Sequence, residues 1–308
     1  MANYTTASLL DQIKRKAFIP SSQSTFTDAE LLGVATDEIH NTILPAVMNT
    51  REEFYVYLKQ HTLDGTIKRF TIPSRAVGMS LREVSVVVGG SERNVPRYDI
   101  EDKVYSDTSG TLYGYYLQNN SVHVLGNQAG DLNLYYYLRP GQLVETSQAT
   151  TTVAVDLVAN TITVNNLPTG WTVGTKLDII SYEPGFDAKS LSNAITAING
   201  TILTFADPLP TNEAGSSTVV SGDWLSLEDT SPVPQMPVEF FQYLAEATTA
   251  YVAESLGDND AYVRCQQRMA QMLKNAQKTI SPRVDGQSKK LVPRRNRGAN
   301  TYTNWRWR

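Results

Sequence analysis

The spacing of apolar residues changes twice along this chain, and these changes limit the folds it can adopt. In residues 1–50, and again in residues 231–280, apolar side chains recur every three or four positions, which is typical of amphipathic helices. Between them, short runs of alternating apolar and polar residues are separated by Gly, Asn and Pro, which is typical of strands and turns. We therefore predict an α+β protein. Its helical ends form a bundle, into which a β-rich region is inserted, and an extended tail follows.

The N-terminal part contains two predicted helices. Residues 8–18 form a short amphipathic segment, and Thr27-Asp28-Ala29-Glu30 fits a capping box at the start of a second helix. Apolar residues at helical spacing continue this second helix to Val47. Pro45 should kink or tighten its last turn, because a proline ring clashes with the preceding helical turn.

Residues 51–146 are predicted to form short strands. Residues 54–59 and 67–72 are expected to pair as a hairpin around Asp64-Gly65. Further strands are predicted at residues 84–88, 114–117, 122–125 and 132–138.

Residues 147–230 contain a degenerate internal repeat. Asn160-Thr161-Ile162-Thr163 leads to Leu167-Pro168-Thr169 and Leu177. Forty-odd residues later, Gly200-Thr201-Ile202-Leu203 leads to Leu209-Pro210-Thr211 and Leu225. Two copies are too few for a solenoid or a propeller. They predict a small barrel or sandwich made of two similar halves.

Residues 231–280 are predicted to form a helical hairpin. The first helix runs from Val238 to Gly257, which is a suitable C-terminal cap, and Asp258-Asn259-Asp260 supplies the next N-terminal cap. The last helix carries an apolar stripe with alternating spacings of three and four residues. This stripe comprises Tyr262, Cys265, Met269, Met272, Ala276 and Thr279.

The net charge of −4 is the sum of an acidic body and a basic tail. Residues 281–308 hold eight Lys or Arg and one Asp, which leaves 19 basic and 30 acidic side chains for residues 1–280. A single Cys excludes a disulfide scaffold and multi-cysteine metal clusters. The sequence has no apolar run of 18 residues and its first residues do not resemble a signal peptide, so we expect no membrane association.

Patterns that would indicate an enzyme or a bound cofactor are absent from the sequence. It has no nucleophile elbow, Walker A loop, dinucleotide fingerprint or zinc-protease helix. The three histidines are far apart in sequence, and Cys265 falls on the apolar stripe, where a buried small hydrophobe is expected. The adjacent acids Glu52-Glu53 and Glu101-Asp102 have no distinctive spacing. We therefore predict no enzymatic activity, no cofactor and no metal. The histidines are His40, His61 and His123.

The chain is rich in tyrosine, with 16 residues. On adjacent strands, these side chains could form a surface that stacks on sugars or bases. They could equally pack within the protein or at a subunit interface, which is the interpretation we favour. The strand tyrosines are Tyr113, Tyr115, Tyr116, Tyr135, Tyr136 and Tyr137.

The C-terminal tail mixes cations with aromatic residues. One interpretation is a docking peptide anchored by its two tryptophans on an acidic partner. A second is nucleic-acid binding, in which Arg and Lys contact phosphates and aromatic rings stack on bases. A third is a solvated tail without a partner. We favour docking. The residues concerned are Lys289, Lys290, Arg294, Arg295, Arg297, Tyr302, Trp305, Arg306, Trp307 and Arg308.

Several segments together resemble head-to-tail connector proteins of tailed bacteriophages, also called adaptor or head completion proteins. The resemblance covers residues 50–145 and 230–295 and is weakest in residues 147–230. The segments are Arg69-Phe70-Thr71-Ile72-Pro73-Ser74-Arg75-Ala76-Val77-Gly78, Leu81-Arg82-Glu83-Val84, Gly114-Tyr115-Tyr116-Leu117, Leu134-Tyr135-Tyr136-Tyr137-Leu138-Arg139-Pro140 and Gln235-Met236-Pro237-Val238-Glu239.

This resemblance implies a virion protein that is made in the host cytoplasm and forms a ring, commonly of twelve subunits. The ring would lie beneath the portal, extend the DNA channel without sequence-specific DNA binding, and dock tail or nozzle proteins. The basic-aromatic tail would bind the portal. A neck or tail-ring protein, a carbohydrate-binding tail-associated protein and a nucleic-acid-binding protein remain alternatives.

Overall fold

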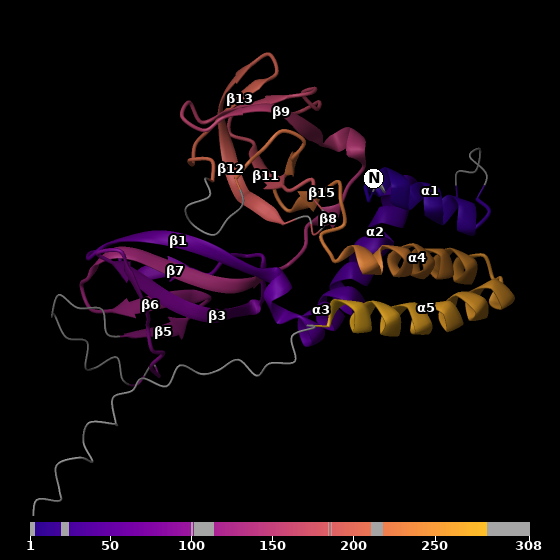
Figure 1. Cartoon of the computed structure of the whole chain (residues 1–308), viewed down its shortest axis with the longest axis horizontal. Helices are drawn as coiled ribbons and strands as arrows, with labels where there is room; N and C mark the ends of the chain where they lie inside the picture. The colour runs from indigo at the N-terminus through magenta and orange to yellow at the C-terminus, as the bar shows by residue number, and fades with distance from the viewer. Residues whose placement is uncertain are drawn as a thin grey trace, which may run out of the picture.

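The protein has three parts that meet near its centre: a helical bundle, a pair of packed β-sheets and a closed β-barrel (Figure 1). The computed structural model describes residues 4–19, 25–99, 101, 114–183, 185, 187–210 and 218–281. The predicted α+β class is confirmed, with helices at both ends of the described chain and a six-stranded barrel in the β region. The sheets extend from one end of the bundle, and the barrel lies beside both (Figure 1).

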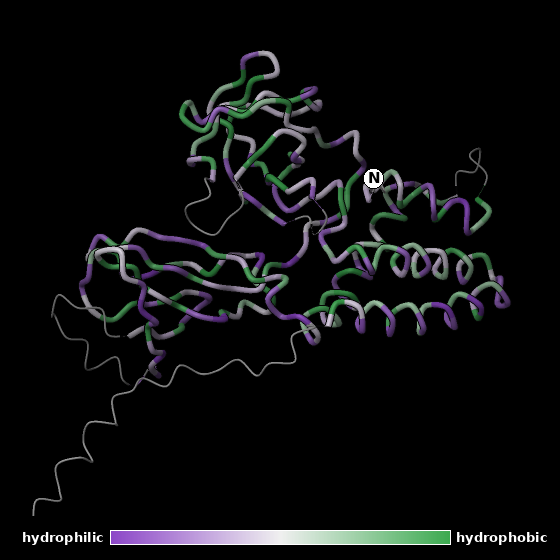
Figure 2. The backbone as a smooth tube through the Cα atoms, in the orientation of Figure 1, coloured by the Kyte–Doolittle hydropathy of each residue, from purple (hydrophilic) through white to green (hydrophobic). Residues whose placement is uncertain are grey.

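Both ends of the described chain contribute to the helical bundle, which is built around α4. This helix is apolar along most of its length, whereas apolar and polar residues alternate along α5 (Figure 2). Helices α1, α2 and α5 each pack against α4, and their buried side chains form one hydrophobic core. The helices are α1 (Thr6–Lys16), α2 (Asp28–Glu38), α3 (Leu44–Thr50), α4 (Phe241–Ser255) and α5 (Asn259–Ile280).

Helix α2 begins with the predicted capping box. The Glu30 backbone N–H donates to Thr27 Oγ1 at 3.2 Å, and the Thr27 N–H donates to Glu30 Oε2 at 2.8 Å. One of the two predicted effects of Pro45 needs correction, because the helix does not tighten here. The chain instead widens into a π-helix, η1 (Ile39–Ile43), before the proline, which lies at the start of α3. The wider turn fits a proline because proline has no N–H to donate and its ring needs space.

The C-terminal hairpin forms as predicted, except at its last turn. Gly257 adopts a positive φ of 74° between the two helices, and Asp258 Oδ1 caps α5 by accepting from the Ala261 N–H at 2.9 Å. Cys265 and Ala276 of the predicted stripe are buried. Thr279 is exposed instead, and Ile280 takes the buried position.

Two antiparallel sheets share one core in the first β region. The larger sheet has the order β1-β7-β3-β4 and the smaller one β2-β6-β5, and buried side chains of both form a single cluster. The strands are β1 (Val56–Asp64), β2 (Arg69–Thr71), β3 (Ala76–Val88), β4 (Ser91–Asn94), β5 (Gly114–Gln118), β6 (Ser121–Leu125) and β7 (Ala129–Leu138).

The predicted hairpin between residues 54–59 and 67–72 is wrong, although its turn is present. Asp64 Oδ1 accepts from the N–H groups of Thr66 and Ile67, and Gly65 has a φ of 80°. The chain then passes to the other sheet: β1 pairs with β7, and β2 pairs with β6. The long β7 pairs with β1 along its whole length, so a pairing distant in sequence forms and the local one does not.

The second β region is a closed barrel, so the sandwich alternative is excluded. Its strands follow the order β10-β13-β12-β11-β14-β9, and β9 pairs with β10 to close the ring. The strands are β9 (Thr150–Asp156), β10 (Thr161–Val164), β11 (Lys176–Ile180), β12 (Ala188–Asn199), β13 (Ile202–Phe205) and β14 (Trp224–Leu227).

The internal repeat corresponds to two halves of this barrel, β9-β10-β11 and β12-β13-β14. Equivalent strands pair antiparallel with each other, β10 with β13 and β11 with β14. Each remaining strand pair also has an equivalent in which the two halves swap roles. The pair of β9 with β10 corresponds to the pair of β12 with β13, and the pair of β9 with β14 corresponds to the pair of β12 with β11. The barrel therefore has a pseudo-two-fold topology. The equivalent residues Leu177 and Leu225 are both completely buried.

Candidate functional site

The residues predicted from sequence to form the docking site lie outside the described part of the chain. These are Lys289, Lys290, Arg294, Arg295, Arg297, Tyr302, Trp305, Arg306, Trp307 and Arg308. The structure therefore does not place them. Two other features of the described chain are candidates for function: a buried polar joint where its three parts meet, and a groove on the helical bundle.

The joint is centred on Arg75, which lies in the turn before β3 and is 8% exposed. Its Nη1 donates to Asp178 Oδ2 of the barrel strand β11 at 2.5 Å. Its Nε and Nη2 donate to the carbonyl oxygen of Arg139, after β7, at 3.1 and 3.0 Å. Nη2 also lies 3.4 Å from Gln235 Oε1, just before the C-terminal helices. One guanidinium thus connects the sheets, the barrel and the approach to the bundle.

Further hydrogen bonds extend this joint to the helical bundle. The side-chain oxygen Oε1 of Gln235 also accepts from the Gly141 N–H at 2.8 Å. The backbone carbonyl oxygen of Gln235 accepts from Tyr55 Oη at 3.2 Å. His40 Nε2 lies 2.9 Å from the carbonyl oxygen of Pro140. The Leu143 N–H donates to Thr36 Oγ1 of α2 at 3.0 Å.

Two short strands mark where the chain enters and leaves the barrel at this joint. They are β8 (Gln142–Leu143) and β15 (Thr230–Ser231), which pair in parallel. A side chain at Gly141 would approach the backbone of Asp229 and Thr230 to about 3.1 Å, so this close crossing favours glycine.

Asp178 is the buried acid of this joint. Its Oδ1 accepts from the Ser192 N–H at 2.8 Å and its Oδ2 from the Asp229 N–H at 3.1 Å. Burial raises the pKa of Asp178 to about 6, against the opposing effects of Arg75 and these two N–H donors. Within the folded protein, desolvation therefore outweighs the attraction of the ion pair for the charged carboxylate.

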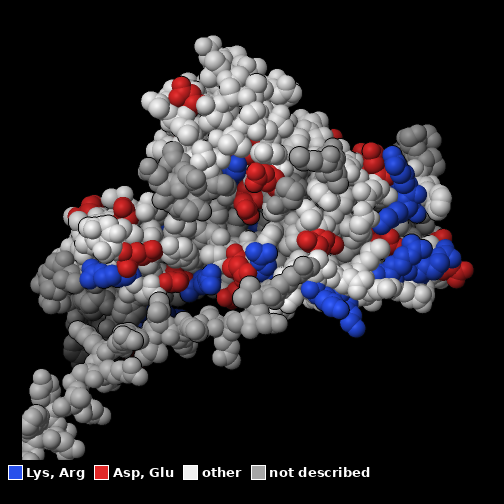
Figure 3. Space-filling view, viewed as in Figure 1, with Lys and Arg blue, Asp and Glu red and all other residues white. Residues whose placement is uncertain are grey.

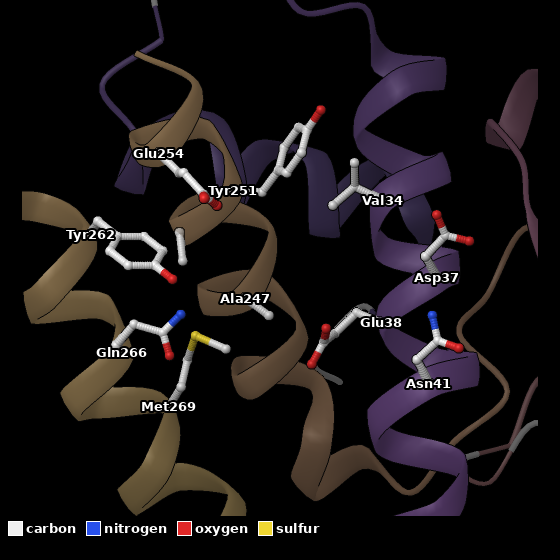
Figure 4. Close-up of a pocket in the computed structure, with 11 residues that line it drawn as sticks. Val34, Asp37, Glu38, Asn41, Ala247, Tyr251, Glu254, Tyr262, Gln266 and Met269 are labelled. Carbon is white, nitrogen blue, oxygen red and sulfur yellow. The ribbon is translucent and has the colours of Figure 1, made fainter. Parts of the chain in front are cut away.

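The groove lies between α2, α4 and α5 and has a volume of about 300 Å³ (Figure 4). It combines carboxylates with aromatic and apolar side chains. Tyr243 of α4 donates to Glu38 Oε1 at 2.6 Å. Burial, and after it the Glu38 carboxylate, raises the pKa of this phenol. The residues that line the groove are Val34, Asp37, Glu38, Asn41, Ala247, Ala250, Tyr251, Glu254, Tyr262, Gln266 and Met269.

The three histidines have different local surroundings. His40 belongs to the joint, His61 lies against the Phe70 ring with centroids 5.2 Å apart, and the His123 ring stacks on Tyr116 at 4.9 Å. Burial lowers the pKa of His61.

Cys265 is buried beside Glu246, as expected for a core residue. Burial raises the pKa of its thiol, and the neighbouring carboxylate raises it further. Glu246 itself is buried in the bundle and accepts from Lys16 at 2.9 Å and from Arg268 at 3.0 Å.

The adjacent acids Glu52 and Glu53, which the sequence analysis did not assign to a site, contact different arginines. Glu52 pairs with Arg82 at 3.4 Å and Glu53 with Arg51 at 3.0 Å, each at an exposed position. Glu101 is exposed, and Asp102 lies outside the described residues.

The tyrosines of β5 and β7 lie in different sheets, so they do not form the alternative, a shared surface on adjacent strands. Tyr115, Tyr116 and Tyr136 are buried in packing positions. Tyr135 and Tyr137 donate their hydroxyls to Glu92 and Glu52, at 3.0 and 3.1 Å. Tyr113 lies outside the described residues.

Sequence reasoning did not identify the joint or the groove. Arg75, Arg139 and Gln235 fall inside the segments that resemble phage connectors, but no spacing links them to Asp178 in the barrel. The acids of the groove are ordinary helix-surface residues in the sequence. Only the fold brings them together.

Neither a metal site, nor a membrane-spanning helix, nor a similarity to a known protein assigns a function to the described chain. In the described ranges, no group of three or more His, Cys, Asp or Glu is arranged to hold a metal ion. The described helices include no segment with the length and hydrophobicity of a membrane span. The chain matches no protein-family model, and no curated protein is significantly similar to it.

Proposed function

We propose that this protein is a structural virion protein, a head-to-tail adaptor of a tailed bacteriophage. In this role, copies of the chain form a ring, commonly of twelve, beneath the portal. The ring extends the channel through which genomic DNA passes without sequence-specific binding, and it offers a docking surface to tail or nozzle proteins. Residues 294–308 bind the portal.

The observation that carries this proposal is the position of the segments that resemble phage connectors. Three of them are far apart in sequence, at residues 69–78, 134–140 and 235–239. They meet at the joint, where Arg75 bonds to the carbonyl of Arg139 and to Gln235. Segments that resemble one family would be expected to meet in space if they maintain the architecture of that family.

The arrangement of the three parts also favours an assembly protein. The sheets and the barrel extend from the bundle in different directions from one joint, which gives a single chain several separate outer surfaces (Figure 1). The barrel carries exposed apolar side chains on its outside, including Val153, Val173 and Val158, which is 98% exposed.

A carbohydrate-binding role receives less support. That alternative relied on a shared surface of tyrosine rings, but Tyr115, Tyr116 and Tyr136 are buried. We therefore keep the adaptor as the proposed function.

The test is binding to the portal protein of the same phage, observed by negative-stain electron microscopy. The full chain should form rings on the portal, and a variant that lacks residues 294–308 should not bind it. A Trp305→Ala/Trp307→Ala variant keeps every charge and should also bind at least about tenfold more weakly if the indoles are anchors. Unchanged binding of the shortened chain would rule out the tail as the portal-binding segment. A chain that never forms rings with the portal would contradict the adaptor role.

A further inference from the structure

We propose that the groove between α2, α4 and α5 binds the C-terminal segment of the same chain, residues 294–308. The groove is lined by acidic, aromatic and apolar side chains, and the segment contains five arginines, three aromatic residues and no acids. This proposal concerns the protein before it meets any partner, and it does not rest on portal binding.

The first argument is charge. Glu38 of α2 points toward α4, and Glu254 lies on α4 (Figure 4). Asp37 of α2 also belongs to the residues that line the groove. None of the described residues that line the groove is Lys or Arg. On the face shown in Figure 3, lysines and arginines instead gather at the end of the bundle that lies away from the sheets. An arginine-rich segment would therefore find unopposed carboxylates in this groove, and each Arg–carboxylate contact there would be charge-assisted.

The second argument is the apolar and aromatic part of the groove. Ala247 and Ala250 contribute small side chains from α4, and Met269 contributes its thioether from α5. Tyr251 of α4 is 45% exposed. Tyr262 lies across from it on α5 (Figure 4). Tyrosine rings are good surfaces for guanidinium groups, and a methionine beside an indole is a favourable contact.

The third argument is reach. The described chain ends at Ser281, directly after α5, and α5 itself forms one wall of the groove. From Met269 to the end of α5 is roughly 17 Å at 1.5 Å per residue. Residues 282–293 can span about 40 Å when extended, so the tail can return to the groove. A tether of this length gives an effective concentration in the millimolar range, which favours the groove of the same molecule over that of a second copy.

A photo-crosslinking experiment on the full chain tests this proposal without a portal. Benzoylphenylalanine replaces Trp305, the protein is irradiated at micromolar concentration, and crosslinked peptides are identified by mass spectrometry. We expect crosslinks to peptides of α2, α4 or the first half of α5, within the monomer band.

A charge-reversed groove provides the specific comparison. Asp37 and Glu254 are exposed, so Asp37→Lys/Glu254→Lys should fold normally while reversing the charge that attracts the segment. We expect the yield of groove crosslinks to fall at least about fivefold. The matched control is Asp11→Lys/Glu101→Lys, which makes the same change in net charge at two exposed positions outside the groove, and its yield should not change.

Three results would overturn the proposal. They are the absence of crosslinks to the groove, an equal loss in both double variants, and crosslinks found only between two copies. A failure here would leave the adaptor role standing, because that role is tested by rings formed with the portal.

Discussion

Arg75 and Asp178 lie 103 positions apart in sequence, and their side chains meet with an Nη1–Oδ2 distance of 2.5 Å. Both side chains are buried, with exposures of 9% and 1%. Arg75 comes from the sheets and Asp178 from the barrel, so this pair connects two parts of the protein that pack separate cores. The consequences of breaking the pair can be predicted from its burial.

Replacement of Arg75 by methionine should destabilise the protein strongly. Methionine fills much of the same space, but it leaves Asp178 buried without its cation and the carbonyl of Arg139 without two donors. Loss of one partner of a buried pair typically costs about 3–5 kcal/mol. Urea denaturation followed by circular dichroism should show this loss.

The matched control for this substitution is Arg51→Met. Arg51 pairs with Glu53 at 3.0 Å, but both side chains are about half exposed. Such pairs contribute about 0–1 kcal/mol. Equal losses in the two variants would contradict a special role for the joint.

The stability of the joint should also depend on pH. The pKa of Asp178 is raised from 3.8 to about 6 in the folded protein, first by burial. Between these values the folded state binds more protons than the unfolded state. The contribution of this carboxyl to stability is therefore complete below about pH 4 and is lost as the pH rises through about 6.

Asp178→Asn removes this titration while it keeps an acceptor for the Ser192 N–H. Relative to this variant, the wild-type protein should lose about 1 kcal/mol between pH 5 and pH 7.5. Parallel urea titrations at the two pH values measure the difference. A wild-type protein that gains stability relative to Asp178→Asn as the pH rises would show that the sign is wrong.

The two halves of the barrel should respond alike to equivalent core substitutions. Leu177 and Leu225 are matching residues of the repeat, and both are completely buried on paired strands. Leu177→Ala and Leu225→Ala should each cost about 2–5 kcal/mol, from lost burial and the cavity left behind. Val158→Ala, at a residue that is 98% exposed, should change stability by less than about 0.5 kcal/mol. Thermal unfolding of the three variants provides the measurement, and a large loss in only one of the two leucine variants would argue against equivalent halves.

The predictions that held depend on interactions between residues close in sequence. The capping box of Thr27 and Glu30 spans three residues, and the glycine and aspartate between α4 and α5 act within one turn. Such signals are carried by the local chain, so they can be identified without knowledge of the fold. The repeat also predicted two similar halves, because each half carries its own hydrophobic pattern.

The predictions that failed involve competition between distant segments. The turn at Asp64 forms, yet its flanking strands pair elsewhere because β7 offers β1 a longer partner. Pairing of strands depends on every strand available, which a local pattern does not reveal. For the same reason, neither Asp178 nor the acids of the groove could be identified: each lacks a partner nearby in sequence. The predicted tail site remains a prediction.

The N-terminal cap of α2 should contribute measurably to stability. Thr27→Ala removes the hydroxyl that accepts from the Glu30 N–H, and it also frees the Glu30 carboxylate from the hydroxyl it binds at 2.9 Å. Loss of such a cap costs about 1 kcal/mol. Thr279→Ala is the control, because Thr279 is exposed within α5, where alanine is the better helix former. Equal destabilisation by the two substitutions would exclude a specific capping effect.

Cys265 should react slowly with thiol reagents in the folded protein. It is the only cysteine of the chain and is 6% exposed, so access of the reagent is limited. Burial and the adjacent Glu246 raise the pKa of its thiol, which keeps the reactive thiolate scarce at neutral pH. Alkylation by iodoacetamide, followed by intact-mass spectrometry, should be at least about tenfold slower in the native protein than in urea. Glu246→Gln removes the nearby charge and should speed native alkylation. The single cysteine makes the result unambiguous, and rapid native labelling would show that α5 does not hold this side chain against α4.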